Sequence, residues 1–277
     1  MSMSVSRNST PRPWLRGIAA NLVAWLSLTV RPRRFRASRL LPPARRLALG
    51  AILGIALVAV SMVLLDARGV TFARAMPPWL VDIFNEITDY GKSAWFLVPI
   101  AGLIVTMAMF APAAERVANL VLTGIVVRLT YLFFAIAVPG LAVTIAKGFI
   151  GRARPSDSGP FAYIPWTWRH EYASLPSGHS TTAFAAAVAI AALWPRMRVP
   201  LLLFAVIIAI SRVVITTHFV SDVVAAAFVG AFGAVLVRNW YAARGLAFSP
   251  GVDGAVHVRP GPSWRRVKAV ARRLIGQ

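Results

Sequence analysis

The chain has 277 residues, of which 58% are hydrophobic and 14% are charged, and its mean hydropathy is +0.67. This composition excludes an ordinary soluble domain and is typical of a chain rich in membrane-spanning helices. The sequence has no cysteine, which excludes a thiolate nucleophile, disulfide bonds and Cys-based metal sites. The formal net charge is +21. The positions of the basic residues therefore decide whether this charge serves nucleic acid or a membrane.

Residues 1–46 are predicted to form a basic segment outside the membrane domain. Within them, the apolar stretch Trp14 to Val30 is interrupted by Arg16 and Asn21 and is followed by an arginine-rich run over 31–36. These features favour a helix that lies in the headgroup region over a further spanning helix. The charges follow the apolar stretch more heavily than they precede it, which argues against a cleaved signal peptide.

Six apolar stretches follow, several of which reach the ~20 residues that a spanning helix needs. Backbone polar groups in lipid must be satisfied inside helices or closed barrels, and barrel strands would alternate in hydropathy. We therefore predict an all-α fold, with one bundle of six transmembrane helices over residues 47–237 and a basic tail over 238–277. The six stretches are Leu47–Leu65, Ala94–Ala111, Leu120–Ala146, Ser177–Trp194, Val199–Ile215 and Phe219–Val237.

The basic residues gather on one side of this predicted topology. Of the 30 Lys and Arg residues, most lie in 1–46, in the loops after the second and fourth stretches, and from Arg238 onward. The positive-inside bias then places both termini in the cytoplasm and the opposite loops on the far face. For the basic termini, attraction to anionic membrane lipids is favoured over nucleic-acid binding, because no aromatic platform or helix-turn-helix signature accompanies the charge.

Three cations, Lys147, Arg154 and Arg212, border apolar stretches on the predicted far face. A charge in such a position is costly without a partner, so each is a candidate functional group, although each taken singly could simply reach to the water boundary. Arginine grips two phosphate oxygens with its planar fork, and lysine supplies a point charge. Together the three suit a bound phosphate.

Pro176, Ser177, Gly178 and His179 form the predicted entry to the fourth stretch. Glycine lets the backbone approach a ligand, and the free N–H groups and dipole of a helix start favour an anion. Ser177 and Gly178 are expected to donate to phosphate oxygens, and His179 to protonate a departing oxygen. Taken alone, this segment is more often a helix cap than a site.

His218 and Asp222 are spaced i to i+4 at the start of the sixth stretch. In a helix this spacing places the carboxylate where it holds the Nδ1 proton and leaves the Nε2 lone pair outward. We therefore expect His218 to be the nucleophile and Asp222 to orient it. Small residues continue at the same spacing and predict a close contact between the two helices: Ala183, Ala187 and Ala191 after His179, and Ala226, Gly230 and Ala234 after Asp222.

The combination resembles the three-part signature of the type 2 phosphatidic acid phosphatase superfamily. Its layout looks like the membrane-bound lipid phosphate phosphatases of that superfamily, and the resemblance covers roughly residues 47–237. Every motif position is matched in order by Lys147, Arg154-Pro155, Pro176 to His179, Ser211-Arg212, His218 and Asp222.

The resemblance implies a phosphoric ester or diphosphate hydrolase in which a phosphohistidine forms on His218, assisted by Asp222, and is then hydrolysed by water. His179 is the implied general acid, and the implied phosphate-binding residues are Lys147, Arg154, Ser177, Gly178 and Arg212. No cofactor is expected, and a reaction without a metal ion is the working assumption. Two alternatives stay open: a non-catalytic lipid-binding or transport protein that retains the pocket, and activity like that of the typically soluble vanadate-dependent haloperoxidases, which hold vanadate in a similar pocket.

The loop over 156–174 is dense in aromatic residues, which suits the headgroup boundary and predicts a lipid-facing rim. We therefore expect a lipid phosphate as substrate. Polyprenyl diphosphate such as undecaprenyl diphosphate, lipid A phosphate, phosphatidylglycerophosphate and phosphatidic acid are the candidates. In a bacterial cell, the active site would lie on the periplasmic face of the inner membrane.

Overall fold

The computed structural model describes residues 13–35, 44–111, 116–156, 159–251 and 255–274. This part of the chain is almost entirely helical, which confirms the predicted all-α class; it adds one short antiparallel hairpin, β1 (Phe248–Pro250) with β2 (Val256–Val258). The helices are α1 (Pro13–Val30), α2 (Ala44–Leu64), α3 (Asp66–Arg74), α4 (Pro78–Asp89), α5 (Ala94–Phe110), α6 (Arg116–Ile150), α7 (Gly178–Leu193), α8 (Arg198–Val214), α9 (Val220–Ala243) and α10 (Trp264–Leu274).

Each of the six predicted stretches is helical. Within the described residues, five helical segments are long and apolar enough to cross a membrane, with α4 and α5 together forming one of them. The remaining stretch is α7, which has 16 residues. It would measure about 24 Å, shorter than the ~30 Å hydrocarbon core of a bilayer. The chain is therefore an integral membrane protein with a helical bundle, and α7 as a sixth span stays a prediction.

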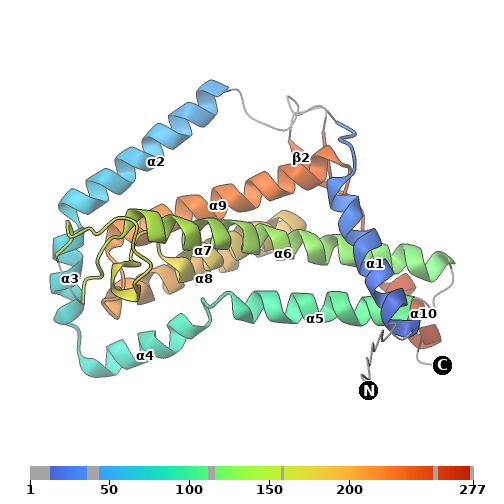
Figure 1. The fold of residues 1–277 in the computed structure, drawn as a ribbon, viewed down its shortest axis with the longest axis horizontal. Coiled ribbons are helices and arrows are strands. Elements are labelled where there is room, and N and C mark those ends of the chain that lie inside the picture. The colour runs from blue at the N-terminus through green and yellow to red at the C-terminus, as the bar shows by residue number, and fades with distance from the viewer. Residues whose placement is uncertain (1–12, 36–43, 112–115, 157–158, 252–254, 275–277) are drawn as a thin grey trace, which may run out of the picture.

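α7 runs between its neighbours α6, α8 and α9 and packs along all three (Figure 1). Its contact with α9 is close at Gly230, where an added Cβ would lie 2.5 Å from the carbonyl oxygen of Thr181. Only glycine tolerates such an approach. The predicted ridge on α9 therefore does face α7.

The predicted matching ridge on α7 was wrong. Ala183 and Ala187 pack with Ala205 and Ile208 of α8. The alanines that share a core with Ala234 of α9 are instead Ala185 and Ala189. α7 is enclosed by neighbours on several sides, so a stripe of alanines on it does not indicate which helix it meets.

The two ends of the bundle differ in what covers them. α3 lies at one end, whereas α1, the hairpin and α10 lie at the other (Figure 1). α1 runs across the ends of α5 and α6; Asn21 Nδ2 donates to the carbonyl oxygen of Ala108 at 3.3 Å, and Trp240 Nε1 donates to that of Thr29 at 2.8 Å. α1 and α10 therefore lie at the same end of the bundle, and the headgroup location of α1 stays a prediction.

The described part of the tail packs on α6. Arg128 Nη1 donates to the carbonyl oxygen of Gly124 at 2.7 Å, and its Nη2 donates to that of Arg259 at 2.7 Å. The ring of Tyr131 lies edge-on to that of Phe248, with centroids 4.7 Å apart. α9 also continues beyond residue 237 to Ala243. The domain limits 1–46, 47–237 and 238–277 stay predictions.

Candidate active site

Four helix ends meet at the end of the bundle where α3 lies (Figure 1). α6 and α8 end there, with Lys147 and Arg212 in their last turns. α7 and α9 begin there, with His179 and Asp222 in their first turns. Because the four helices pack against one another, motifs that are far apart in the sequence come together at one end.

Asp222 is fully buried and accepts hydrogen bonds from three directions. Its Oδ1 accepts from Arg152 Nη1 at 2.6 Å. Its Oδ2 accepts from Ser174 Oγ at 2.5 Å and from the backbone N–H of Phe219 at 2.9 Å. These bonds fix the orientation of the carboxylate, as expected of a group that must position a neighbour.

His218 lies in the turn between α8 and α9 and is buried. Its Nδ1 faces Asp222 Oδ2 at 3.6 Å, which exceeds a hydrogen-bond distance. The expected stacking of His218 and Asp222 on one helix face does not occur, because α9 begins only at Val220. The turn before α9 brings the His218 ring next to Asp222 instead. Burial lowers the pKa of His218 to about 4 despite the adjacent carboxylate, so the ring is neutral near pH 7.

Ser177 caps α7, as the sequence predicted for a helix entry. Its Oγ accepts from the Ser180 backbone N–H at 3.5 Å and from Ser180 Oγ at 3.0 Å, and its own N–H donates to the Asp222 carbonyl oxygen at 3.2 Å. Because Ser177 Oγ is an acceptor in both of these bonds, its hydroxyl proton is available to donate a hydrogen bond to a phosphate. The space beside Gly178 is open, since an added Cβ would meet Lys147 Nζ only at 3.8 Å.

The predicted cations form one electrostatic group at this end. Lys147 lies within range of electrostatic repulsion from both Arg154 and Arg212, and His179 lies within range of Lys147 and Arg212. The Nε of Arg212 is buried and has no hydrogen-bond partner in the part of the chain that the structure describes. Clustered cations with a buried N–H still to satisfy suit a phosphate ligand.

Residues outside the motifs hold two of these arginines. Arg154 Nε donates to the carbonyl oxygen of His170 at 3.0 Å, and its Nη2 lies 3.2 Å from the ring Nε2 of that histidine. Arg212 Nη1 donates to Thr88 Oγ1 of α4 at 3.0 Å. His170 and Thr88 thus help to fix the positions of these two arginine side chains.

Comparison with known proteins gives the family. The PAP2 superfamily model matches residues 128–246. A lipid A 1-phosphatase of Rhizobium etli is 34% identical over 71% of this chain and 86% of that protein, and one of Rhizobium johnstonii is 33% identical over 83% of this chain and 94% of that protein. The chain belongs to the PAP2 superfamily. A transmembrane PAP2 type phosphatidylglycerolphosphate phosphatase of Bacillus subtilis matches with a TM-score of 0.43 and 20% identity, over 81% of this chain and 95% of that chain.

As a member of this superfamily, the protein is a membrane-embedded phosphatase, that is, a phosphoric ester hydrolase.

Two charged residues beside Asp222 in the candidate site were not predicted from the sequence. Arg152 and Asp66 are both fully buried and are joined by a 2.7 Å contact between Arg152 Nη2 and Asp66 Oδ2. A signal for Asp66 was present, because an acid directly after an apolar stretch is a functional candidate. Arg152 lies two residues before Arg154, and no motif or regular spacing in the sequence includes it.

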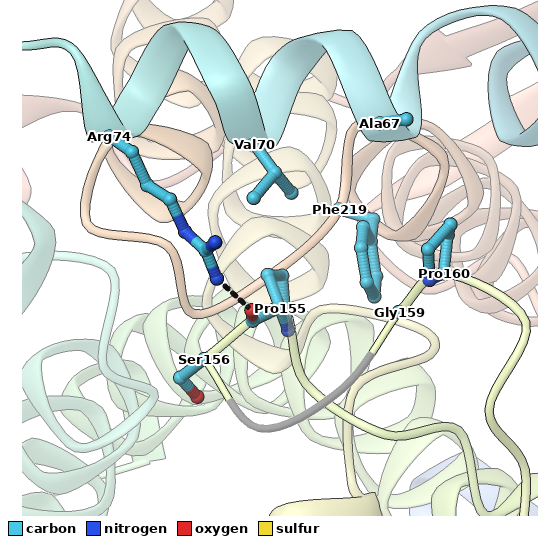
Figure 2. A pocket seen from close by; sticks show the side chains of 8 residues that line it. All are labelled: Ala67, Val70, Arg74, Pro155, Ser156, Gly159, Pro160 and Phe219. Atoms are coloured by element: carbon cyan, nitrogen blue, oxygen red, sulfur yellow. Dashed lines mark hydrogen bonds between the residues drawn. The ribbon is translucent and has the colours of Figure 1, made fainter.

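A cavity of about 330 Å³ adjoins the candidate site, between α3 and the loop after α6. Figure 2 shows Arg74 of α3 reaching across it to the carbonyl oxygen of Pro155, to which Nη2 donates at 3.1 Å, with the ring of Phe219 on another wall. Pro155 follows Arg154 and Phe219 follows His218 in the chain. The cavity is thus a neighbour of the site and is lined by different side chains.

Proposed function

We propose that this PAP2 phosphatase removes the 1-phosphate of lipid A through a phosphohistidine on His218. The observation that carries the mechanism is the buried pairing of His218 with Asp222 beside the cations Lys147 and Arg212. The two Rhizobium relatives, both described as lipid A 1-phosphatases, support the choice of lipid. A neutral imidazole next to a fixed carboxylate suits a nucleophile, because the carboxylate stabilises the cationic ring that forms on attack.

In the proposed first step, His218 Nε2 attacks the phosphorus atom and the bond from phosphorus to the lipid oxygen breaks. Lys147, Arg154 and Arg212 hold the other phosphate oxygens, together with the N–H groups at the start of α7, where Ser177 and Gly178 lie. The lipid leaves as an alcohol. Water then attacks the phosphohistidine, the P–N bond breaks, and inorganic phosphate is released.

His179 is the proposed general acid. It lies in the first turn of α7, and its charged neighbours include Lys147 and Arg212. A bound phosphate brings negative charge among these cations and so favours the protonated imidazole. His179 can then give its proton to the departing lipid oxygen and take one back from the attacking water.

The proposed reaction needs no metal ion. In the described ranges, the structure gathers no three His, Asp or Glu side chains into a group that could hold a metal. The positive charge that a metal would supply in phosphoryl transfer is available from the three cations. The three cations therefore carry the proposal of metal-independent catalysis.

We further propose that the protein lies in a bacterial inner membrane with its site on the periplasmic face. Support comes from the distribution of basic residues and from the position of α1 and α10 at the bundle end away from the motifs (Figure 1). The exposed basic residues of α10 also suit contact with anionic lipid, among them Arg265, Arg266 and Lys268.

The test is phosphate release by the detergent-purified full chain, with EDTA present, from lipid A 1-phosphate, undecaprenyl diphosphate, phosphatidylglycerophosphate and phosphatidic acid. We expect release from lipid A 1-phosphate by the wild type and none by His218→Ala. His257→Ala is the matched control, because it removes a histidine from the hairpin at the other end of the bundle.

Each outcome separates a different part of the proposal. Preference for another lipid would overturn the substrate and keep the chemistry. Release that requires a metal or survives His218→Ala would overturn the mechanism. Silence of the wild type on every lipid would favour a non-catalytic lipid-binding or transport protein.

A further inference from the structure

The side chain of Arg152 is fully hydrogen-bonded. Its five N–H groups match five hydrogen bonds: Nε donates to the Pro160 carbonyl oxygen at 3.1 Å, Nη1 to Ser221 Oγ at 2.7 Å and to Asp222 Oδ1 at 2.6 Å, and Nη2 to Asp66 Oδ2 at 2.7 Å and to the Pro160 carbonyl oxygen at 2.8 Å. The ring of Phe219 covers the guanidinium, 4.2 Å from Cζ. Arg152 therefore has no N–H to offer a phosphate, although it stands two residues from Arg154.

Asp66 completes the assembly from α3. Its Oδ1 accepts from the Ser221 backbone N–H at 2.8 Å, and its Oδ2 accepts from Ser221 Oγ at 2.6 Å as well as from Arg152. It thus grips the first turn of α9, directly beside Asp222. Asp66 also lies outside residues 128–246, the part of the chain that the superfamily model matches.

The formal charges of the assembly do not cancel. Asp66 and Asp222 carry two negative charges and Arg152 one positive charge, and all three side chains are fully buried. If Asp222 were the only partner of Arg152, the guanidinium would neutralise it. Because Asp66 shares that guanidinium, the cluster keeps a net negative charge next to the His218 ring.

We infer that Asp66 and Arg152 are positioning residues of the phosphatase, which fix Asp222 and preserve its negative charge so that it stabilises the ring of His218 as it becomes cationic. The inference rests on the proposed function. Neither residue touches the phosphate, so both act on the chemical step and leave substrate binding largely unchanged.

The test compares kcat and KM of the full chain in detergent for wild type and Asp66→Asn, which keeps the shape of the side chain and removes its charge. We expect kcat to fall about 10- to 100-fold, a loss of the size that is typical when a metal ligand loses its outer hydrogen-bond partner, while KM stays within about twofold. The melting temperature is measured on the same samples. Asp82→Asn is the matched control, because it removes an exposed acid from α4.

Coupling to Asp222 distinguishes a positioning role from a structural one. The rate constant of a single turnover is measured in both backgrounds. If Asp66 acts through Asp222, adding Asp66→Asn to Asp222→Asn lowers this rate constant no further. A wild-type kcat in Asp66→Asn, or equal losses in both backgrounds, would overturn the inference. Failure of the wild type to release phosphate from any lipid would instead overturn the proposed function.

Two milder variants keep the test decisive if Asp66→Asn is poorly folded. Ser221→Ala removes one hydroxyl that bridges Arg152 and Asp66, and Arg152→Lys keeps the charge with fewer donors. Both should lower kcat at unchanged KM, and Arg169→Lys, at an exposed arginine, should not. Variants that fold normally and keep wild-type kcat would contradict the inference.

Discussion

Arginine serves different purposes at the two ends of the bundle. Near α3, Arg152 is fully buried between the carboxylates of Asp66 and Asp222. At the other end, Arg128 is half-buried and donates to the carbonyl oxygens of Gly124 and Arg259. Burying a charge completely is costly without an opposite charge, whereas a half-buried guanidinium can be satisfied by dipoles and water. Buried carboxylates are therefore placed where the proposed chemistry uses them.

The largest effect expected at the α3 end concerns His179. Asn in its place cannot protonate a leaving oxygen, so His179→Asn should lower kcat on the lipid substrate by about 10²- to 10⁴-fold. A good leaving group needs no proton, so the loss on 4-nitrophenyl phosphate should be far smaller. Steady-state assays on both substrates check this, with His257→Asn as the control. Equal losses on the two substrates would contradict the role of general acid.

The Thr88 contact tests whether Arg212 must be held in place. Thr88→Val removes the hydroxyl that accepts from Arg212 Nη1 at 3.0 Å and keeps the shape of the side chain. A hydrogen bond to a charged group is worth about 1.5–3 kcal/mol, so kcat/KM should fall about tenfold or more. Thr106→Val in α5 is the control, because that exposed hydroxyl bonds only within its own helix. Equal kcat/KM in the two variants would show that Arg212 needs no support from α4.

The sequence predicted the helices and the gathering of the motifs because both signals are local. Apolar runs mark spans, and the cations and histidines stand where those runs end. The Asp66–Arg152 and Thr88–Arg212 contacts were not predicted, because they join residues 86 and 124 positions apart and no local pattern indicates which ends meet. The prediction that Ala183 and Ala187 of α7 face α9 was wrong for a related reason, since an enclosed helix has no single inward face.

At the other end of the bundle, Arg128 should matter for stability and little for activity. Arg128→Gln removes the charge that bonds the Arg259 carbonyl oxygen and should destabilise the protein by about 1–2 kcal/mol. Its kcat should stay within about twofold of wild type, because the residue is remote from the motifs. Thermal unfolding in detergent and phosphate release check the two parts, with the exposed Arg265→Gln as control. A loss of kcat without a loss of stability would show that the two ends are coupled.

The smallest expected effect is the absence of a titration. Burial lowers the pKa of His218 to about 4, so its ring should stay neutral as the pH falls from 7.5 to 5.5, whereas an exposed histidine titrates near 6.5. Histidine NMR of the ligand-free protein in detergent checks this, with His218→Gln used to assign the resonance. A midpoint near 6.5 would show that Asp222 outweighs the burial.

The most direct test of the account is to trap the intermediate. Wild type and His218→Ala are mixed with lipid A that carries ³²P in its 1-phosphate, quenched in alkali within one turnover, and digested for mass spectrometry. The account predicts a label that is stable in alkali and lost in acid, located on His218 and absent from His218→Ala. Phosphate release without any labelled protein, or a label on another residue, would contradict it.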